Sequence, residues 1–232
     1  MRLLKNIFSE TLHLFYPHVC TGCGTDIVEK DQLLCLKCIN ELPHTGFAPF
    51  KDNPVEKYFR GRIRFEAAHS EFYFSKGSLI QQLIHELKYK DNKAIGVYLA
   101  ELTGSSLLRS DRFNDIDALV PLPLYAHKER MRGYNQATVI CHGLSAILNV
   151  PTIIGNVTRE RFTETQTRKH RSERWTNVFE SFAVRNKRAL HGKHILLVDD
   201  VVTTGATLEA CGTAIVQAGA KISFATLALA SK

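Results

Sequence analysis

The stretch that decides the fold of this chain runs from His194 to Leu208 and reads His-Ile-Leu-Leu-Val-Asp-Asp-Val-Val-Thr-Thr-Gly-Ala-Thr-Leu. Its aliphatic run, Ile195 to Val198, is continuous rather than alternating, which favours a strand covered on both faces of a parallel sheet. The predicted strand ends on two adjacent carboxylates, Asp199 and Asp200. A tight loop and an apolar-periodic helix follow. Ligands of such sheets bind beyond the carboxyl ends of the strands, so this turn is the expected binding site.

The loop after the carboxylates has the composition of a phosphate cradle. Glycine lets the main chain approach an anion, hydroxyl groups add donors, and the first N–H groups of the next helix add partial positive charge. These features are supplied by Thr203, Thr204, Gly205, Ala206 and Thr207. The carboxylates would repel a phosphate, but ribose hydroxyls or a divalent cation would suit them. Because the chain also lacks a Gly-x4-Gly-Lys-Ser/Thr motif, a phosphorylated sugar is favoured over a nucleoside triphosphate.

Length and composition indicate a globular protein. With 232 residues, 44% of them hydrophobic, the chain is predicted to form one ordinary domain and a small appendage. The net charge of +7 favours acidic partners, either a sugar phosphate or a nucleic acid, although a basic excess is also typical of a solvated surface. No apolar stretch is long enough to predict a membrane span.

The first residues, Met1–Phe8, begin like a secretory signal, but polar residues interrupt the apolar run and no small-residue cleavage site follows. We therefore expect a cytoplasmic protein with an amphipathic N-terminal helix packed on its surface. Membrane contact by this helix is the alternative interpretation.

Four cysteines form two Cys-x2-Cys pairs, Cys20 with Cys23 and Cys35 with Cys38. Two such pairs supply the four soft ligands of a tetrahedral structural zinc site, which leaves no open position for catalysis. Disulfides or free thiols are the alternatives, and a cytoplasmic location argues against disulfides. We predict an N-terminal helix and zinc module over residues 1–45. A linker rich in Pro and Gly over 46–61 and a second domain over 62–232 would follow.

A basic belt between Arg159 and Arg188 contains the aromatic residues Phe162, Trp175 and Phe179. Aromatic stacking combined with phosphate contacts would suit single-stranded DNA or RNA. The alternative, which we favour, is an amphipathic helix that packs its aromatic residues inward.

Several motifs together carry a resemblance to a known family. The twelve residues from Leu196 to Thr207 closely resemble the signature loop of type I phosphoribosyltransferases. The four-cysteine module, Pro121-x-Pro123 and the segment from Arg132 to Ala137 resemble the ComF branch of that family. Further matches at the family's spacings are Lys88, Tyr89, Arg159, Thr163, Gln166, Arg174, Asn177 and Phe182. The chain departs from the pattern at Lys169, where the family has Leu.

The resemblance implies an α/β fold with a mainly parallel sheet flanked by helices, and binding of phosphoribosyl pyrophosphate with Mg²⁺. It implies that the catalytic pair Asp199 and Asp200 contacts the ribose and that the small-residue loop holds the 5-phosphate. Lys88 and Arg132 are the candidates for the pyrophosphate. The chain would then transfer ribosyl phosphate to an unknown acceptor.

The alternative function is handling of single-stranded DNA in natural transformation, with competence proteins as partners and with or without transferase activity. A sensor of phosphoribosyl pyrophosphate with a degenerate active site is a third and weaker hypothesis.

Overall fold

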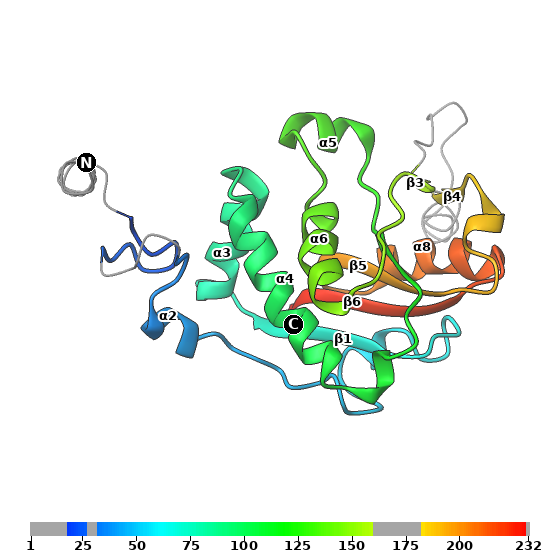
Figure 1. Ribbon diagram of the computed structural model, residues 1–232, viewed down its shortest axis with the longest axis horizontal. Helices are drawn as coiled ribbons and strands as arrows, with labels where there is room; N and C mark the ends of the chain where they lie inside the picture. Colours follow the sequence, from blue (N-terminus) through cyan, green and yellow to red (C-terminus); the bar gives the residue numbers. More distant parts are fainter. Residues whose placement is uncertain (1–17, 27–31, 160–181, 231–232) are drawn as a thin grey trace, which may run out of the picture.

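A four-stranded parallel sheet forms the centre of the computed structural model, which describes residues 18–26, 32–159 and 182–230 (Figure 1). The strand order is β1-β6-β5-β2, and every neighbouring pair is parallel. The strands are β1 (Ala68–Phe74), β2 (Ala118–Pro121), β5 (His194–Val202) and β6 (Lys221–Ala230). A separate antiparallel ribbon pairs β3 (Val157–Arg159) with β4 (Phe182–Val184). The predicted α/β class with a mainly parallel sheet is confirmed.

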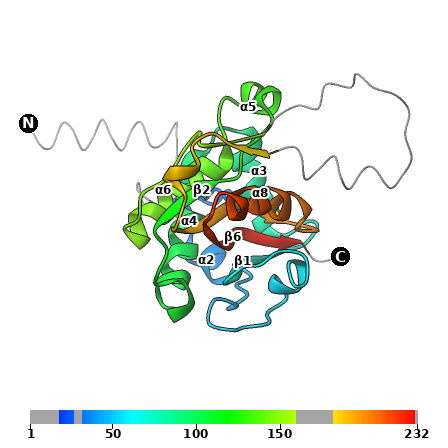
Figure 2. The same ribbon diagram turned by 90° about the vertical axis from the view of Figure 1, so that its right-hand side faces the viewer.

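Helices cover both faces of this sheet, as the continuous apolar run of β5 predicts. Leu196 and Val198 pack into one hydrophobic cluster with helices α3 (Leu79–Tyr89), α4 (Lys93–Leu108) and α6 (Gln136–Leu148). Ile195 and Leu197 pack into a second cluster with helix α8 (Ala206–Gln217). All four strand side chains are fully buried. Figure 2 shows the same arrangement from the side.

The remaining helices among the described residues are short. The helix α5 (Ala126–Arg132) projects away from the sheet at the top of Figure 1, and α2 (Leu36–Asn40) belongs to the N-terminal region. Three single turns of 3-10 helix are η1 (Glu56–Tyr58), η2 (Asp111–Phe113) and η3 (Lys187–Ala189).

Polar side chains fix where the long helices begin. Ser78 Oγ accepts a hydrogen bond from the backbone N–H of Gln81, 3.3 Å away, and so caps α3. Asn92 caps α4 in the same way, and Asn135 caps α6. The end of α3 and the start of α6 lie close to the carboxyl edge of the sheet, where Lys88 contacts Asp200 and the Asn135 side chain donates to the backbone carbonyl of Leu122.

The segment before the first strand packs closely against the sheet. Phe59 is fully buried and stacks on Phe224 of β6, with ring centroids 4.1 Å apart. The Asn53 side-chain amide donates to the backbone carbonyl of Ala68, 2.9 Å away. Residues 46–61 therefore contribute to the second hydrophobic cluster. The domain boundaries at 45 and 61 stay predictions.

Two sequence predictions lie outside the described residues. The amphipathic helix expected at the N-terminus falls within residues 1–17, and most of the basic belt, with Thr163, Gln166 and Trp175, falls within residues 160–181. In the described part of the chain, none of the helices has the length and apolar character needed to cross a membrane.

Candidate functional site

The carboxyl edge of the sheet has a step where β5 extends beyond its neighbour β2. Strand β2 pairs with β5 only from Ala118 to Pro121, and its last partner is Val198. Strand β5 continues to Val202 because the ten-residue β6 stays paired with it, Val202 lying opposite Leu229. The sequence predicts that the strand ends on the carboxylates, and the strand extends two residues further, to Val202. The two acids lie inside the strand, along its unpaired side.

The adjacent carboxylates have different surroundings. Asp200 is 8% exposed, and its Oδ1 lies 2.8 Å from Lys88 Nζ on α3. Asp199 Oδ1 accepts a hydrogen bond from the backbone N–H of Asp200 at 2.8 Å. Burial, followed by the negative charge of Asp200, raises the pKa of Asp199 to about 8, against the opposing effect of that hydrogen bond and of the positive charges of Lys88 and Arg159. At neutral pH the pair therefore carries less than its full negative charge.

The loop between β5 and α8 exposes small side chains. Thr203 and Thr204 are exposed, and Gly205 immediately precedes the first residue of α8. Gly205 has a φ of +73°, and a Cβ atom there would lie 3.1 Å from Phe59 Cε1, so both the backbone conformation and the space favour glycine. Gly205 has no side chain to cap α8, and the first N–H of the helix, from Ala206, lies 3.4 Å from Thr204 Oγ1 in the loop. This arrangement suits an anion.

The sequence analysis did not identify Arg62, which contacts the loop between β5 and α8. Its guanidinium donates to the backbone carbonyl of Thr204, 3.2 Å away, and pairs with Glu209 in the first turn of α8. Glu209 is buried, and this ion pair offsets its negative charge next to the loop. An acid in a first helical turn is readable from sequence. Its partner, from a part of the chain more than a hundred residues away, has no local signal.

Lys88 and Arg132 line a basic cavity of about 560 Å³ between the end of α3 and α5. The Arg132 guanidinium lies over the Tyr89 ring, 5.3 Å from its centroid, and donates to Gln136 Oε1 at 2.8 Å. The complete lining is Lys88, Tyr89, Lys90, Asp91, His127, Lys128, Met131 and Arg132. Because Lys88 also pairs with Asp200, this cavity adjoins the carboxylates, and five of its eight side chains are basic or imidazole groups.

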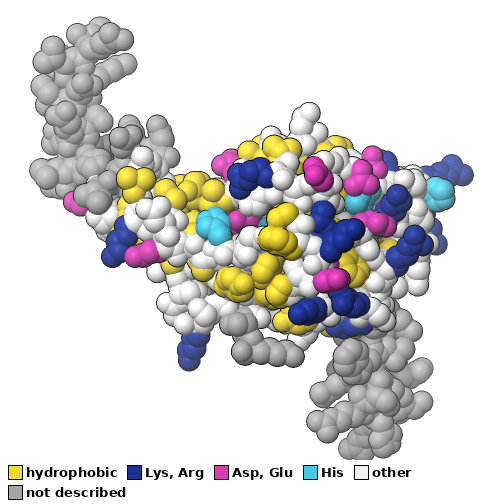
Figure 3. Space-filling model, turned by 90° about the horizontal axis from the view of Figure 1, so that it is seen from below, with side chains coloured by type: hydrophobic (Ala, Val, Ile, Leu, Met, Phe, Trp, Pro, Cys, Tyr) yellow, Lys and Arg dark blue, Asp and Glu magenta, His cyan; other side chains and the backbone are white. Residues whose placement is uncertain are grey.

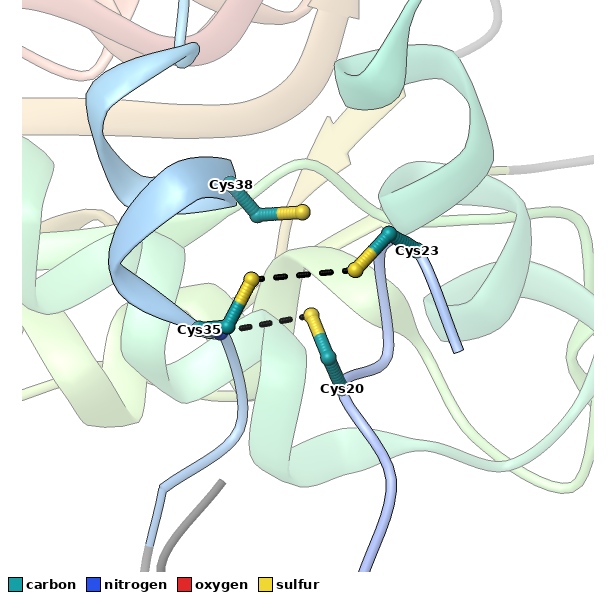
Figure 4. Close-up of side chains that lie close together, drawn as sticks. All are labelled: Cys20, Cys23, Cys35 and Cys38. Carbon is teal, nitrogen blue, oxygen red and sulfur yellow. Dashed lines mark hydrogen bonds between the residues drawn. The ribbon is translucent and has the colours of Figure 1, made fainter. Parts of the chain in front are cut away.

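The four predicted cysteines meet in one cluster, and their Sγ atoms all lie within 4.8 Å of one another (Figure 4). Cys23 Sγ and Cys35 Sγ are 3.7 Å apart. Four sulfurs around a tetrahedral zinc ion at bond lengths of ~2.3 Å would be separated by ~3.8 Å, so the cluster fits zinc after small adjustments. The four cysteines are arranged to bind a metal ion, as the sequence predicts.

Hydrogen bonds prepare Cys20 for the thiolate form that metal binding requires. Burial acts to raise the pKa of Cys20, but backbone hydrogen bonds from Cys23, Cys35 and Gly22 outweigh it and lower the pKa to about 6. The backbone N–H of Cys35 lies 3.3 Å from Cys20 Sγ. By contrast, burial raises the pKa of Cys38. Zinc would supply the positive charge that stabilises the remaining thiolates.

Helix α3 connects the cysteine cluster to the carboxylates. The Gln82 side-chain amide donates to the backbone carbonyls of Thr21 and Gly22, at 3.1 and 2.8 Å. A Cβ atom at Gly22 would lie only 2.8 Å from Leu79 Cδ1, which shows how closely the cysteine turn packs on this helix. Lys88, at the other end of α3, pairs with Asp200.

Known proteins resemble this chain over most of its length. A family model described as "Phosphoribosyl transferase domain" matches residues 135–232. Competence protein F of Haemophilus influenzae is 30% identical over 202 residues, which span 85% of this chain and 84% of the relative. Competence protein ComFC of Bacillus subtilis is 26% identical over 91% of this chain and 83% of its own length.

A shorter match joins this chain to DNA utilization protein YhgH of Escherichia coli, which is 32% identical over 61% of this chain and 63% of the relative. Glutamine phosphoribosylpyrophosphate amidotransferase from B. subtilis aligns in structure with a TM-score of 0.43, over 62% of this chain and 30% of the other, at 15% identity. The phosphoribosyl transferase match, the extended similarity to competence protein F and the clustered cysteines agree with one another. This chain belongs to the ComF family.

Proposed function

We propose that this protein binds phosphoribosyl pyrophosphate through its ribose and its 5-phosphate. The observation that carries the proposal is the step at the end of β5, where Asp199 and Asp200 lie shortly before the small residues from Thr203 to Thr207, the first two of which are exposed. The carboxylates are assigned to the ribose hydroxyls, and the loop and the start of α8 to the 5-phosphate.

The basic cavity is assigned to the pyrophosphate. Lys88 and Arg132 both line it, and Lys88 also contacts Asp200, so a ligand held by the carboxylates is within reach of its positive charges. A Mg²⁺ ion bound with the ligand would offset part of the pyrophosphate charge, and Asp199 and Asp200 supply the hard oxygen ligands it prefers. Four cysteines would hold zinc in a purely structural role.

Transfer of ribosyl phosphate to an acceptor is the reaction that such a site would support. Positive charge develops on the sugar as pyrophosphate leaves, so the carboxylates stabilise the transition state and the basic residues stabilise the leaving group. No nucleophilic side chain is needed, because the enzyme acts by holding the two reactants in line.

Isothermal titration with phosphoribosyl pyrophosphate and Mg²⁺ tests the binding site. We expect the wild type to bind and Asp200→Asn to bind at least tenfold more weakly, because one charged ribose contact is lost. Asp111→Asn, at an exposed carboxylate on η2, is the matched control and should bind like the wild type. Unchanged affinity in Asp199→Asn and Asp200→Asn at saturating Mg²⁺ would refute the assignment of the ribose site.

A second candidate function is handling of single-stranded DNA in the cytoplasm, together with competence proteins. The names of the relatives, competence protein F and DNA utilization protein YhgH, favour it, as does the net charge of +7. Lys and Arg side chains also gather on the right-hand half of the lower face of the molecule (Figure 3).

The salt dependence of oligonucleotide binding tests this second function. A strand held by several phosphate contacts loses affinity steeply as salt rises, with a slope of about −0.7 per contact for a single strand. A flat salt dependence, or no binding at low salt, would leave small-molecule binding as the supported function.

A further inference from the structure

A second cleft opens beside the step, between the β2–α5 loop and the β3–β4 ribbon. Its volume is about 310 Å³, near the lower end of the range for small-ligand pockets, so it suits one small ring rather than a polymer. The cleft and the basic cavity share no lining residue. Its lining consists of Pro121, Pro123, Leu124, Ala126, Glu129, Asn135, Thr138, Ile154, Gly155, Val157, Thr158, Arg159 and Arg185.

Arg159 is held by aromatic rings at this cleft. Its guanidinium lies 4.0 Å from the ring centroid of Tyr125 and 5.1 Å from that of Phe182. The Nε atom is buried and has no hydrogen-bond partner among the described residues. A buried N–H without a partner is costly, and a stacked guanidinium is oriented for planar, two-point recognition. These features suit a guanidinium that binds a ligand.

The cleft and the basic cavity adjoin opposite faces of β5. Consecutive residues of a strand point to opposite faces, and Asp200 points to Lys88 on α3. Val157 and Phe182, on the two strands of the β3–β4 ribbon, pack in the same hydrophobic cluster as α8, and the Arg159 guanidinium lies over the Phe182 ring, so Arg159 lies toward the α8 face. The charge of Arg159 also reaches Asp199. Lys88 therefore lies on the α3 face of β5, and Arg159 lies on the α8 face.

On this geometry, and resting on the proposed function above, we infer that the Arg159 cleft is the acceptor subsite. In a displacement at the ribose C1, the entering and leaving groups occupy opposite sides of the sugar. The acceptor supplies the electron pair of the new bond to C1, the bond from C1 to the pyrophosphate oxygen breaks, and pyrophosphate leaves with that electron pair. The acceptor proton is released to water. With pyrophosphate assigned to the Lys88 side, the Arg159 side is left for the acceptor.

The chemistry of Arg159 narrows the acceptor to a class. A guanidinium only donates hydrogen bonds, so the edge that meets it must present acceptors. A second arginine, Arg185, lines the same cleft, and Glu129 is its one acidic lining residue. The acceptor is therefore a planar ring with carbonyl or carboxylate oxygens on one edge. A ring with an amino group on that edge is disfavoured.

Titration with defined rings in the presence of ribose 5-phosphate and Mg²⁺ tests the inference without turnover. The probes are orotate, uracil, xanthine and adenine, with pyrophosphate measured separately. We expect at least one of the three oxo-substituted rings to bind at least tenfold more tightly than adenine. In Arg159→Lys, which keeps the charge but loses the planar fork, we expect that ring to bind roughly ten- to hundredfold more weakly. Pyrophosphate binding should change less than twofold.

Two further variants keep the test decisive. Tyr125→Leu removes one supporting ring and leaves the guanidinium in place, so ring binding should weaken by roughly threefold. Arg188→Lys, on η3 and outside the cleft, is the matched control and should bind every probe like the wild type. Circular dichroism of each variant excludes loss of folding as the cause.

Three outcomes overturn the inference. The first is a loss of pyrophosphate affinity in Arg159→Lys as large as its loss of ring affinity. The second is adenine binding at least as tightly as every oxo-substituted ring. The third is that no oxo-substituted ring binds although ribose 5-phosphate does. Failure of the proposed function gives a different result from failure of this inference. If the wild type binds neither ribose 5-phosphate nor phosphoribosyl pyrophosphate, the sugar site itself is refuted.

Discussion

Replacing Asp199 by Asn should change how the stability of the protein depends on pH. Burial, followed by the charge of Asp200, raises the pKa of Asp199 from its ordinary 3.8 to about 8. Between these two values the folded chain holds one proton more than the unfolded chain. Folding is therefore favoured most fully below the unfolded pKa, and this contribution is lost as pH rises toward 8.

The expected size of the effect follows from one proton. The stability of the wild type should fall by ~1.4 kcal/mol per pH unit relative to Asp199→Asn, which has no carboxyl group to titrate. From pH 5 to pH 7 the difference in unfolding free energy should grow by ~2.7 kcal/mol in favour of the variant. Urea unfolding at pH 5, 6 and 7, without Mg²⁺ or ligand, measures it.

A difference in unfolding free energy between the wild type and Asp199→Asn that is the same at every pH reflects a change in packing. A difference that grows with pH reflects the extra proton bound by the folded wild type. Asp200→Asn removes the neighbouring charge that helps to raise the pKa of Asp199, so its curve should diverge from the wild type less steeply than that of Asp199→Asn. Parallel curves for the wild type and Asp199→Asn would refute the reasoning, because they would mean that Asp199 titrates alike in the folded and unfolded chains.

Three further predictions concern the surroundings of the carboxylates. Lys88→Met removes the partner of Asp200 and should lower the unfolding free energy at pH 7 by ~1–3 kcal/mol in urea titrations, whereas Lys90→Met, at an exposed pair with Glu86, should cost less than ~0.5 kcal/mol. Metal analysis should find one zinc ion per chain in the wild type and in Cys141→Ser, and markedly less zinc in Cys35→Ser. Chelation of the zinc should lower the Tm by ~2–4 °C per kcal/mol of binding energy lost. Arg62→Lys should raise amide hydrogen exchange in residues 203–207 by roughly tenfold, and Arg64→Lys should not; equal exchange in both variants would contradict the role of Arg62 in supporting the loop.

Local patterns in the sequence predicted the parts of the protein that depend on local chemistry. The continuous run before Asp199 identified a strand buried on both faces, and the spacing of the cysteines identified their cluster. In each case a few consecutive residues determine the local structure, so their order in the chain is sufficient.

Long-range pairing was not predictable in this way. The true end of β5 depends on the length of β6, and the support of the loop depends on Arg62, far away in the sequence. Prolines and glycines in residues 46–61 suggested a linker, yet Asn53 and Phe59 pack against the sheet. Tertiary contacts of this kind leave no periodic signal, because nothing in the neighbouring residues specifies the partner.

The unpaired side of β5 also has a consequence for how this protein tolerates sequence change. Past Val198 the strand has a neighbour on one side only, so the edge of β5 beside Asp199 and Asp200 presents unpaired main chain. Main-chain hydrogen-bonding groups are the same whatever side chains they carry. Substitutions of the side chains around this edge can therefore alter which acceptor is bound while the main chain of β5 keeps its geometry. The residues that hold the sugar phosphate and those that select the acceptor can then change independently.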